Sequence, residues 1–232
     1  MMKNLTMHMF LLALVFKVSQ PATAQTAPPP PQSVPVLADG DQEFWLLWND
    51  MTWEIGNSGI KLVVPAGFVT DFASIPQFLW STGLTPTGRY GRAAIIHDFL
   101  YWSQGCTKAQ SDRLLVIAMK ESQVDEIDEK IIYAGVSVGG AKSWKNNQDM
   151  RERKVLRVVP TEYRAFDANQ RWLEYREILM TKGVHDPVFE KSPNYCQLGD
   201  SFNVPGSVTK TVEKKSTIIR LPGDAPILQT EI

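Results

Sequence analysis

The chain has few of the residues on which several functional classes depend. Its 232 residues include two cysteines and three histidines, which argues against a multi-histidine or cysteine-rich zinc site. The chain has 24 basic and 25 acidic residues, so its composition lacks the excess of basic residues that is typical of nucleic-acid-binding proteins. The chain has no internal repeat, no heptad run and, after residue 24, no apolar stretch long enough to span a bilayer. These absences leave a globular protein with one sizeable domain and extensions.

The first 24 residues have the pattern of a secretory signal peptide. Lys3 provides the positive start, residues 9–16 form a short apolar core, and Ala22-Thr23-Ala24 is a cleavage site of the A-x-A type. An anchoring helix would need about 20 apolar residues. We therefore predict an exported protein, periplasmic or secreted, without a transmembrane segment in the mature chain.

The remaining chain is predicted to have an α+β fold. Residues 25–41, with four consecutive prolines, are predicted to be a Pro-rich linker. Alternating apolar residues and turn signals over residues 43–70 predict a small antiparallel sheet with a hairpin. Three helices are expected between residues 90 and 144. The predicted core domain covers residues 42–145, and residues 146–232 are a helical and irregular C-terminal extension, partly flexible.

Local signals define the predicted helices. The first runs from about Tyr90 to Trp102, and the second begins at Thr107, whose side chain can form a capping box with Gln110. The third begins near Asp125. It has a periodic apolar face that we expect to be buried, made of Ile127, Ile131, Ala134 and Val138.

Further helical and apolar positions carry packing predictions. Gly135 and Gly139, one turn apart, are expected to permit close helix packing. An amphipathic helix is expected over residues 161–180. Five tryptophans are expected in the core rather than on a carbohydrate-stacking surface: Trp45, Trp48, Trp53, Trp80 and Trp102.

The segment from His97 to Tyr101 contains the most informative polar residues. On a helix, His97 and Tyr101 share a face, and their apolar neighbours predict burial, so their polar atoms need partners. Asp112 shares a stripe with apolar residues of the second helix and is expected to point inward. A histidine–carboxylate pair fixes the imidazole tautomer and can make it a general base. A satisfied structural histidine is an equally open interpretation, and Tyr101 is expected to pack with its hydroxyl on a carboxylate.

A second polar cluster precedes the first helix. Thr70 and Asp71 follow the end of a strand, where site residues often collect. Ser74 is best explained as a helix cap. A nucleophilic pair of Ser74 with His97 is a weaker alternative, because Ser74 lacks a nucleophile-elbow context.

The two cysteines, Cys106 and Cys196, are candidates for a disulfide. Two thiols of an exported chain more often pair than remain free. Nothing near Cys106 has the pattern of a catalytic thiol.

Together, the segments 70–76 and 93–101 and the pair Ser111-Asp112 resemble the bacterial and phage family catalogued as "domain of unknown function 1353", over about residues 42–145. This resemblance implies a fold neighbourhood and no activity.

The His-Asp-x-x-Tyr helix, followed by an Asp on the next helix, also resembles the phospholipase A2-like superfamily. That resemblance implies that His97 activates water, that Asp98 binds Ca²⁺ together with carbonyl oxygens of the loop over residues 83–91, and that Tyr101 and Asp112 support the histidine.

The sequence thus leads to two hypotheses about function. The first is a metal-assisted hydrolase of the cell envelope, acting on a lipid or another ester or amide, with His97 as general base. The alternative is a non-catalytic envelope binding or structural module, in which His97, Asp98, Tyr101 and Asp112 form a buried polar network. A cell-envelope component is the expected partner; the substrate and the oligomeric state are left open.

Overall fold

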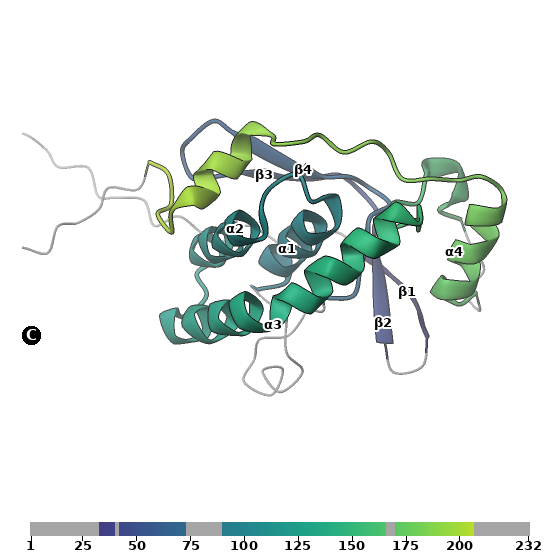
Figure 1. Ribbon diagram of the computed structural model, residues 1–232, viewed down its shortest axis with the longest axis horizontal. Coiled ribbons are helices and arrows are strands. Elements are labelled where there is room, and N and C mark those ends of the chain that lie inside the picture. Colours follow the sequence, from purple (N-terminus) through teal and green to yellow (C-terminus); the bar gives the residue numbers. More distant parts are fainter. Residues whose placement is uncertain (1–32, 40–41, 73–89, 166–169, 207–232) are drawn as a thin grey trace, which may run out of the picture.

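The computed structural model describes residues 33–39, 42–72, 90–165 and 170–206 (Figure 1). Small antiparallel sheets precede a set of helices along the chain, which confirms the predicted α+β class. Within the described residues, no helix combines the length and the apolar character that crossing a membrane requires.

Within the described ranges, five strands form two antiparallel sheets. One sheet has the order β1-β2-β5, and the other is a hairpin of β3 and β4. The strands are β1 (Ser33–Asp39), β2 (Gln42–Leu47), β3 (Met51–Glu54), β4 (Lys61–Val64) and β5 (Val69–Thr70). The predicted hairpin is confirmed, with Trp53 opposite Leu62 and both side chains buried.

Strand β1 corrects the predicted linker, because it lies within residues 25–41. Its Pro35 pairs with Trp45 of β2. Proline lacks the amide hydrogen that an inner strand needs, so it is tolerated at a sheet edge, and β1 is such an edge strand.

The helices follow the sheets and surround one buried helix. They are α1 (Gly91–Ser103), α2 (Lys108–Glu121), α3 (Glu126–Glu152) and α4 (Trp172–Thr181), with the 3₁₀ helices η2 (Thr161–Tyr163) and η3 (Asn194–Asp200). Helix α1 packs against α2, α3, β4 and β5, and nearly all its side chains are buried. Figure 1 shows α3 as a long helix that crosses the molecule in front of α1.

The predicted helix starts are confirmed, but the predicted buried face of α3 is wrong. Thr107 and Gln110 form the capping box, and Asp125 caps α3. Ile127 and Val138 are 69% and 84% exposed, whereas Ile132 and Val136 are buried. Both pairs satisfy helical spacing, and the contacts of α3 with α1 and α2 select the second stripe.

Two further predictions need correction. Trp48 is an exposed residue rather than a core residue. The amphipathic helix expected over residues 161–180 is divided into η2 and α4. The residues 166–169 between them, like Trp80, lie outside the described part.

The C-terminal extension packs on the rest of the fold. Val69 donates to the carbonyl of Arg157 (2.9 Å), and Val159 donates to the carbonyl of Gly67 (2.9 Å). Trp172 and Leu179 of α4 pack in a cluster with Phe44, Leu46 and Val69. Residues 157–159 thus lie beside the chain that enters β5, and α4 covers part of β2.

The two cysteines form a disulfide. Cys106, between α1 and α2, is bonded to Cys196 in η3, with a Cα–Cα distance of 5.2 Å. This bond holds η3 against α2, which it contacts.

Candidate functional site

The candidate site is built around His97 on α1 and Asp112 on α2. The capping box sets the start of α2, and Asp112 follows it by one turn, so its side chain faces α1. His97 Nε2 lies 3.1 Å from Asp112 Oδ1. A carboxylate only accepts hydrogen bonds, so Nε2 is the donor and Nδ1 carries the lone pair of the neutral imidazole. The predicted histidine–carboxylate pair is therefore present.

Asp112 collects two further donors. The Tyr101 hydroxyl donates to Oδ1 (2.6 Å) and Lys108 Nζ donates to Oδ2 (2.7 Å). Burial raises the pKa of Asp112, but the hydrogen bonds from His97, Lys108 and Tyr101 outweigh it and leave the pKa below its usual value. Asp112 is therefore ionised at neutral pH and orients three side chains at once.

His97 is held in its neutral form. The residue is 1% exposed, and burial lowers its pKa despite the opposing influence of Asp112. Burial and the hydrogen bond to Asp112 raise the pKa of Tyr101, so the phenol stays protonated and acts as a donor. A neutral imidazole, oriented by a carboxylate through one nitrogen, has the protonation state of a general base.

The second predicted cluster lies beside the first. The Thr70 hydroxyl donates to Asp98 Oδ2 (2.5 Å) and accepts from the amide of Phe72 (3.2 Å). Asp71 forms an ion pair with Arg157 at 3.2 Å. The short strand β5 therefore connects to α1 through Thr70, and Asp71, the residue after the strand, connects to the C-terminal extension.

The described donors do not form a calcium site by themselves. Calcium takes six to eight oxygen ligands, and no group of three or more His, Cys, Asp or Glu side chains in the described part of the chain is arranged to hold a metal ion. Asp98, the predicted ligand, is hydrogen-bonded to Thr70. The loop carbonyls predicted over residues 83–91 lie outside the described residues up to position 89. Calcium binding stays a prediction.

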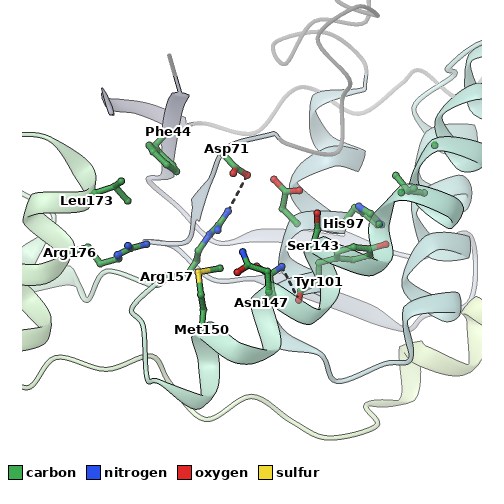
Figure 2. A pocket seen from close by; sticks show the side chains of 16 residues that line it. Phe44, Asp71, His97, Tyr101, Ser143, Asn147, Met150, Arg157, Leu173 and Arg176 are labelled. Atoms are coloured by element: carbon green, nitrogen blue, oxygen red, sulfur yellow. Dashed lines mark hydrogen bonds and ion pairs between the residues drawn. The ribbon is translucent and has the colours of Figure 1, made fainter. Parts of the chain in front are cut away.

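A cavity of about 460 Å³ borders this network. Its polar wall includes Asp71, His97, Asp98 and Tyr101, and its apolar wall includes Phe44, Val136, Met150 and Leu173. Figure 2 shows His97 and Tyr101 at one end, and Arg176 and Phe44 at the other. The volume is in the range of small-molecule sites, and mixed polar and apolar walls are typical of them.

Beyond α3, three described cavity residues come from the extension and were not singled out from the sequence. Arg157, Leu173 and Arg176 reach the cavity because residues 157–159 pair with residues 67–69 and α4 packs on the sheet. No local pattern marks such long-range contacts. The third helix was expected to end by residue 144, yet α3 continues to Glu152 and contributes Asn147, which donates to the carbonyl of Tyr101 (3.3 Å).

The glycines of α3 have roles different from those predicted. A Cβ at Gly135 or Gly139 would meet no atom within 4 Å, and both glycines line the cavity. The close approach occurs at Gly140, where a Cβ would collide with the Tyr101 hydroxyl. Gly140 thus makes room for the hydrogen bond between Tyr101 and Asp112.

Most predicted site residues meet in this region, and others do not. Thr70, Asp71, His97, Asp98, Tyr101 and Asp112 form the cluster described above. Ser74 lies outside the described residues. Asp186, outside the predicted site, accepts hydrogen bonds from Trp102 Nε1 (2.5 Å) and from the amides of Arg157 and Val158 (2.8 Å each). It fixes the backbone that carries Arg157.

Comparisons with known proteins cover the central part of the chain. Residues 45–136 match the family described as "Protein of unknown function (DUF1353)". An "Uncharacterized protein y4jT" of Sinorhizobium fredii (strain NBRC 101917 / NGR234) is 33% identical over 95 residues, which are 40% of this chain and 28% of that protein. The chain thus spans little more than a quarter of that relative. No solved structure matches the chain.

Proposed function

Residues 45–136 belong to the DUF1353 family, as predicted from their motifs. From the geometry of the site, we propose that the chain is a hydrolase with His97 as general base. One observation carries the proposal: a neutral, buried His97 donates from Nε2 to Asp112 and borders a cavity of small-molecule size. The resemblance to phospholipase A2-like helices agrees with these roles and stays a prediction.

The proposed reaction is the attack of water on an ester or amide carbonyl. His97 Nδ1 takes one proton as the water oxygen bonds to the carbonyl carbon. His97 then returns this proton to the leaving oxygen or nitrogen as its bond to carbon breaks, giving an acid and an alcohol or amine. Asp112 stabilises the imidazolium formed in between, and Tyr101 and Lys108 hold Asp112 in place.

We also propose that this hydrolase works outside the cytoplasm, on an ester or amide of the cell envelope. The signal-peptide pattern of residues 1–24 supports export. The disulfide between Cys106 and Cys196 supports an oxidising compartment.

The proposal is tested with two conservative variants. His97→Gln keeps a donor for Asp112 but has no basic nitrogen, so turnover should fall about 10²–10⁴-fold, the usual contribution of a general base. His185→Gln changes an exposed histidine and should leave turnover unchanged. Both proteins and the wild type are incubated with lipid and peptidoglycan extracts, and the products are identified by mass spectrometry. A product formed equally by His97→Gln would exclude the general-base role.

The second candidate is a non-catalytic envelope module. It is favoured by the 1% exposure of His97 and by the full set of donors on Asp112. On this reading His97→Gln alters the melting temperature, and no extract yields a product with any variant.

Assistance by calcium has a separate test. If Asp98 binds calcium together with backbone oxygens, Ca²⁺ should raise the melting temperature of the wild type and have no effect on Asp98→Asn. Equal melting curves for the wild type with calcium and with a chelator would reject the calcium prediction and leave the His97 proposal standing.

A further inference from the structure

Arg176 is a cavity residue whose charge is poorly compensated. Its side chain is 17% exposed, and its Nε atom is buried without a hydrogen-bond partner among the described residues. The carboxylate paired with it belongs to Glu177, at 3.9 Å and with a side chain that is 65% exposed. A half-buried guanidinium with a buried, unsatisfied Nε and such weak pairing is unfavourable unless another anion completes its surroundings.

The groups around Arg176 add positive charge. Burial lowers its pKa, Glu177 opposes this, and Arg157 and Arg153 lower the pKa further. The combined field of the three guanidiniums therefore favours a negative group beside Arg176.

Arg157 is fixed in place beside Asp71 in the cavity wall, between Arg176 and His97 in Figure 2. It donates from Nε to the carbonyl of Val69 (2.6 Å) and pairs with Asp71 (3.2 Å). Its guanidinium also lies over the rings of Phe68 and Trp102, at 5.8 and 5.6 Å from their centroids. Asp71 neutralises part of the positive charge of Arg157. The second cavity carboxylate, Asp98, accepts a hydrogen bond from Thr70. Arg176 is thus left as the cavity cation with the weakest carboxylate pairing.

We propose that the Arg176 end of the cavity is a subsite for an anionic group of the substrate, of the phosphate or carboxylate type. Arg176 is the main ligand, because a guanidinium can donate two parallel hydrogen bonds to such an anion, and Arg157 is the second cation. Figure 2 shows the Arg176 guanidinium directed toward Arg157, with His97 at the far end. The subsite lies outside the family segment 45–136, so it belongs to the extension of this chain.

The apolar wall defines the rest of the substrate. Phe44 and Leu173 line the cavity near Arg176, and Met150 lies between the two ends (Figure 2). Resting on the proposed function, this arrangement fits an ester or amide with an apolar portion and one anionic group, its carbonyl at His97 and its anion at Arg176.

Binding of two probes to the full protein tests the subsite without an activity measurement. Inorganic phosphate and octyl phosphate are titrated by calorimetry at constant ionic strength, into wild type, Arg176→Gln and Arg171→Gln. Arg171 begins the same helix, and its side chain is 48% exposed and is not part of the cavity wall, so Arg171→Gln makes the same charge change as a matched control. Loss of hydrogen bonds to a charged group should weaken binding to Arg176→Gln about 10–100-fold, with Arg171→Gln unchanged.

Each outcome has a defined meaning. Equal binding by all three proteins, or no binding of either probe to the wild type, overturns the subsite. Octyl phosphate binding tighter than inorganic phosphate supports the subsite with an amphiphilic anion as ligand, and equal affinities support it with the free anion as ligand. The titration is repeated with His97→Gln. If that variant binds the probes but the wild type hydrolyses nothing, the subsite stands and the proposed function fails.

Discussion

One carboxylate, Asp112, orders three side chains from two helices, and this leads to a prediction about acid stability. Its pKa is lower in the folded protein than in the unfolded chain, so its ionised form stabilises the fold above about pH 4. This stabilisation is lost as the pH falls through the lower folded pKa. Asp112→Asn should be about 3–5 kcal/mol less stable at pH 7, as for other broken buried pairs, and its stability should change less below pH 4.

The measurement is urea unfolding of both proteins from pH 7 to pH 2.5. Lys108→Met serves as a partial control, because it removes one donor of Asp112 and keeps those of His97 and Tyr101. Parallel pH profiles for wild type and Asp112→Asn would contradict the assignment of this acid dependence to Asp112.

Asp186 is the second residue that organises the site, through the backbone of the extension. It accepts three hydrogen bonds, from Trp102 Nε1 and the amides of Arg157 and Val158. Asp186→Asn places an amide hydrogen against one of these donors, so the protein should lose about 1–3 kcal/mol. The fluorescence emission of Trp102 should shift. His185→Asn, a change at the neighbouring exposed residue, should alter neither the stability nor the emission of Trp102. An unaltered unfolding curve for Asp186→Asn would refute the role of Asp186.

Residue contacts were predictable where they depend on helical spacing. His97 and Tyr101 are four residues apart on one helix and therefore share a face. Asp112 lies on the buried face of the next helix, so the three side chains meet. Arg157 and Arg176 depend on contacts of residues 157–159 and of α4 with the sheet, and Asp186 depends on a hydrogen bond from Trp102, 84 positions earlier. The local sequence carries no signal for such contacts.

At the scale of elements, two adjacent glycines of α3 have opposite expected effects. Gly139→Ala adds a Cβ that meets nothing within 4 Å, so it should stabilise the helix by up to about 1 kcal/mol. Gly140→Ala brings the same gain in helix propensity, but its Cβ collides with the Tyr101 hydroxyl and crowds Lys108. Its melting temperature should therefore be lower than that of Gly139→Ala.

The mechanism behind this difference is tested in a Tyr101→Phe background, where the hydroxyl is absent. The penalty of Gly140→Ala should shrink there, because the two changes act on one contact. An unchanged penalty would show that Gly140 acts through something other than Tyr101.

The elements themselves were predictable to different degrees. Caps at Thr107 and Asp125 were correct because a cap is decided by residues within one turn. The buried stripe of α3 was wrong because two apolar stripes had the same spacing, and the packing of α1 and α2 decides between them. Strand β1 was missed because Pro35 lies in it, and its edge position is a property of the sheet rather than of the segment.

For the whole molecule, the extension is held in place by the disulfide and by contacts that do not need it. The bond between Cys106 and Cys196 closes a loop with a sequence separation of 90, and removing it should cost about 2–5 kcal/mol. Independent hydrogen bonds join Arg113 to the carbonyl of Gly199 (2.5 Å) and Lys120 to that of Phe202 (2.8 Å).

The double variant Cys106→Ser, Cys196→Ser should therefore fold, with lower stability and an intact site. The site is formed by Phe44, residues 70–71, α1, α2, α3 and residues 157–176, and neither cysteine lines the cavity. Urea unfolding of the wild type should shift with a reductant, and that of the variant should not. Phosphate titration should give the same affinity for both proteins if the bond acts on stability alone. A reduced affinity in the variant would mean that the disulfide also positions the cavity, because α2 carries both the cap next to Cys106 and the Asp112 that orients His97.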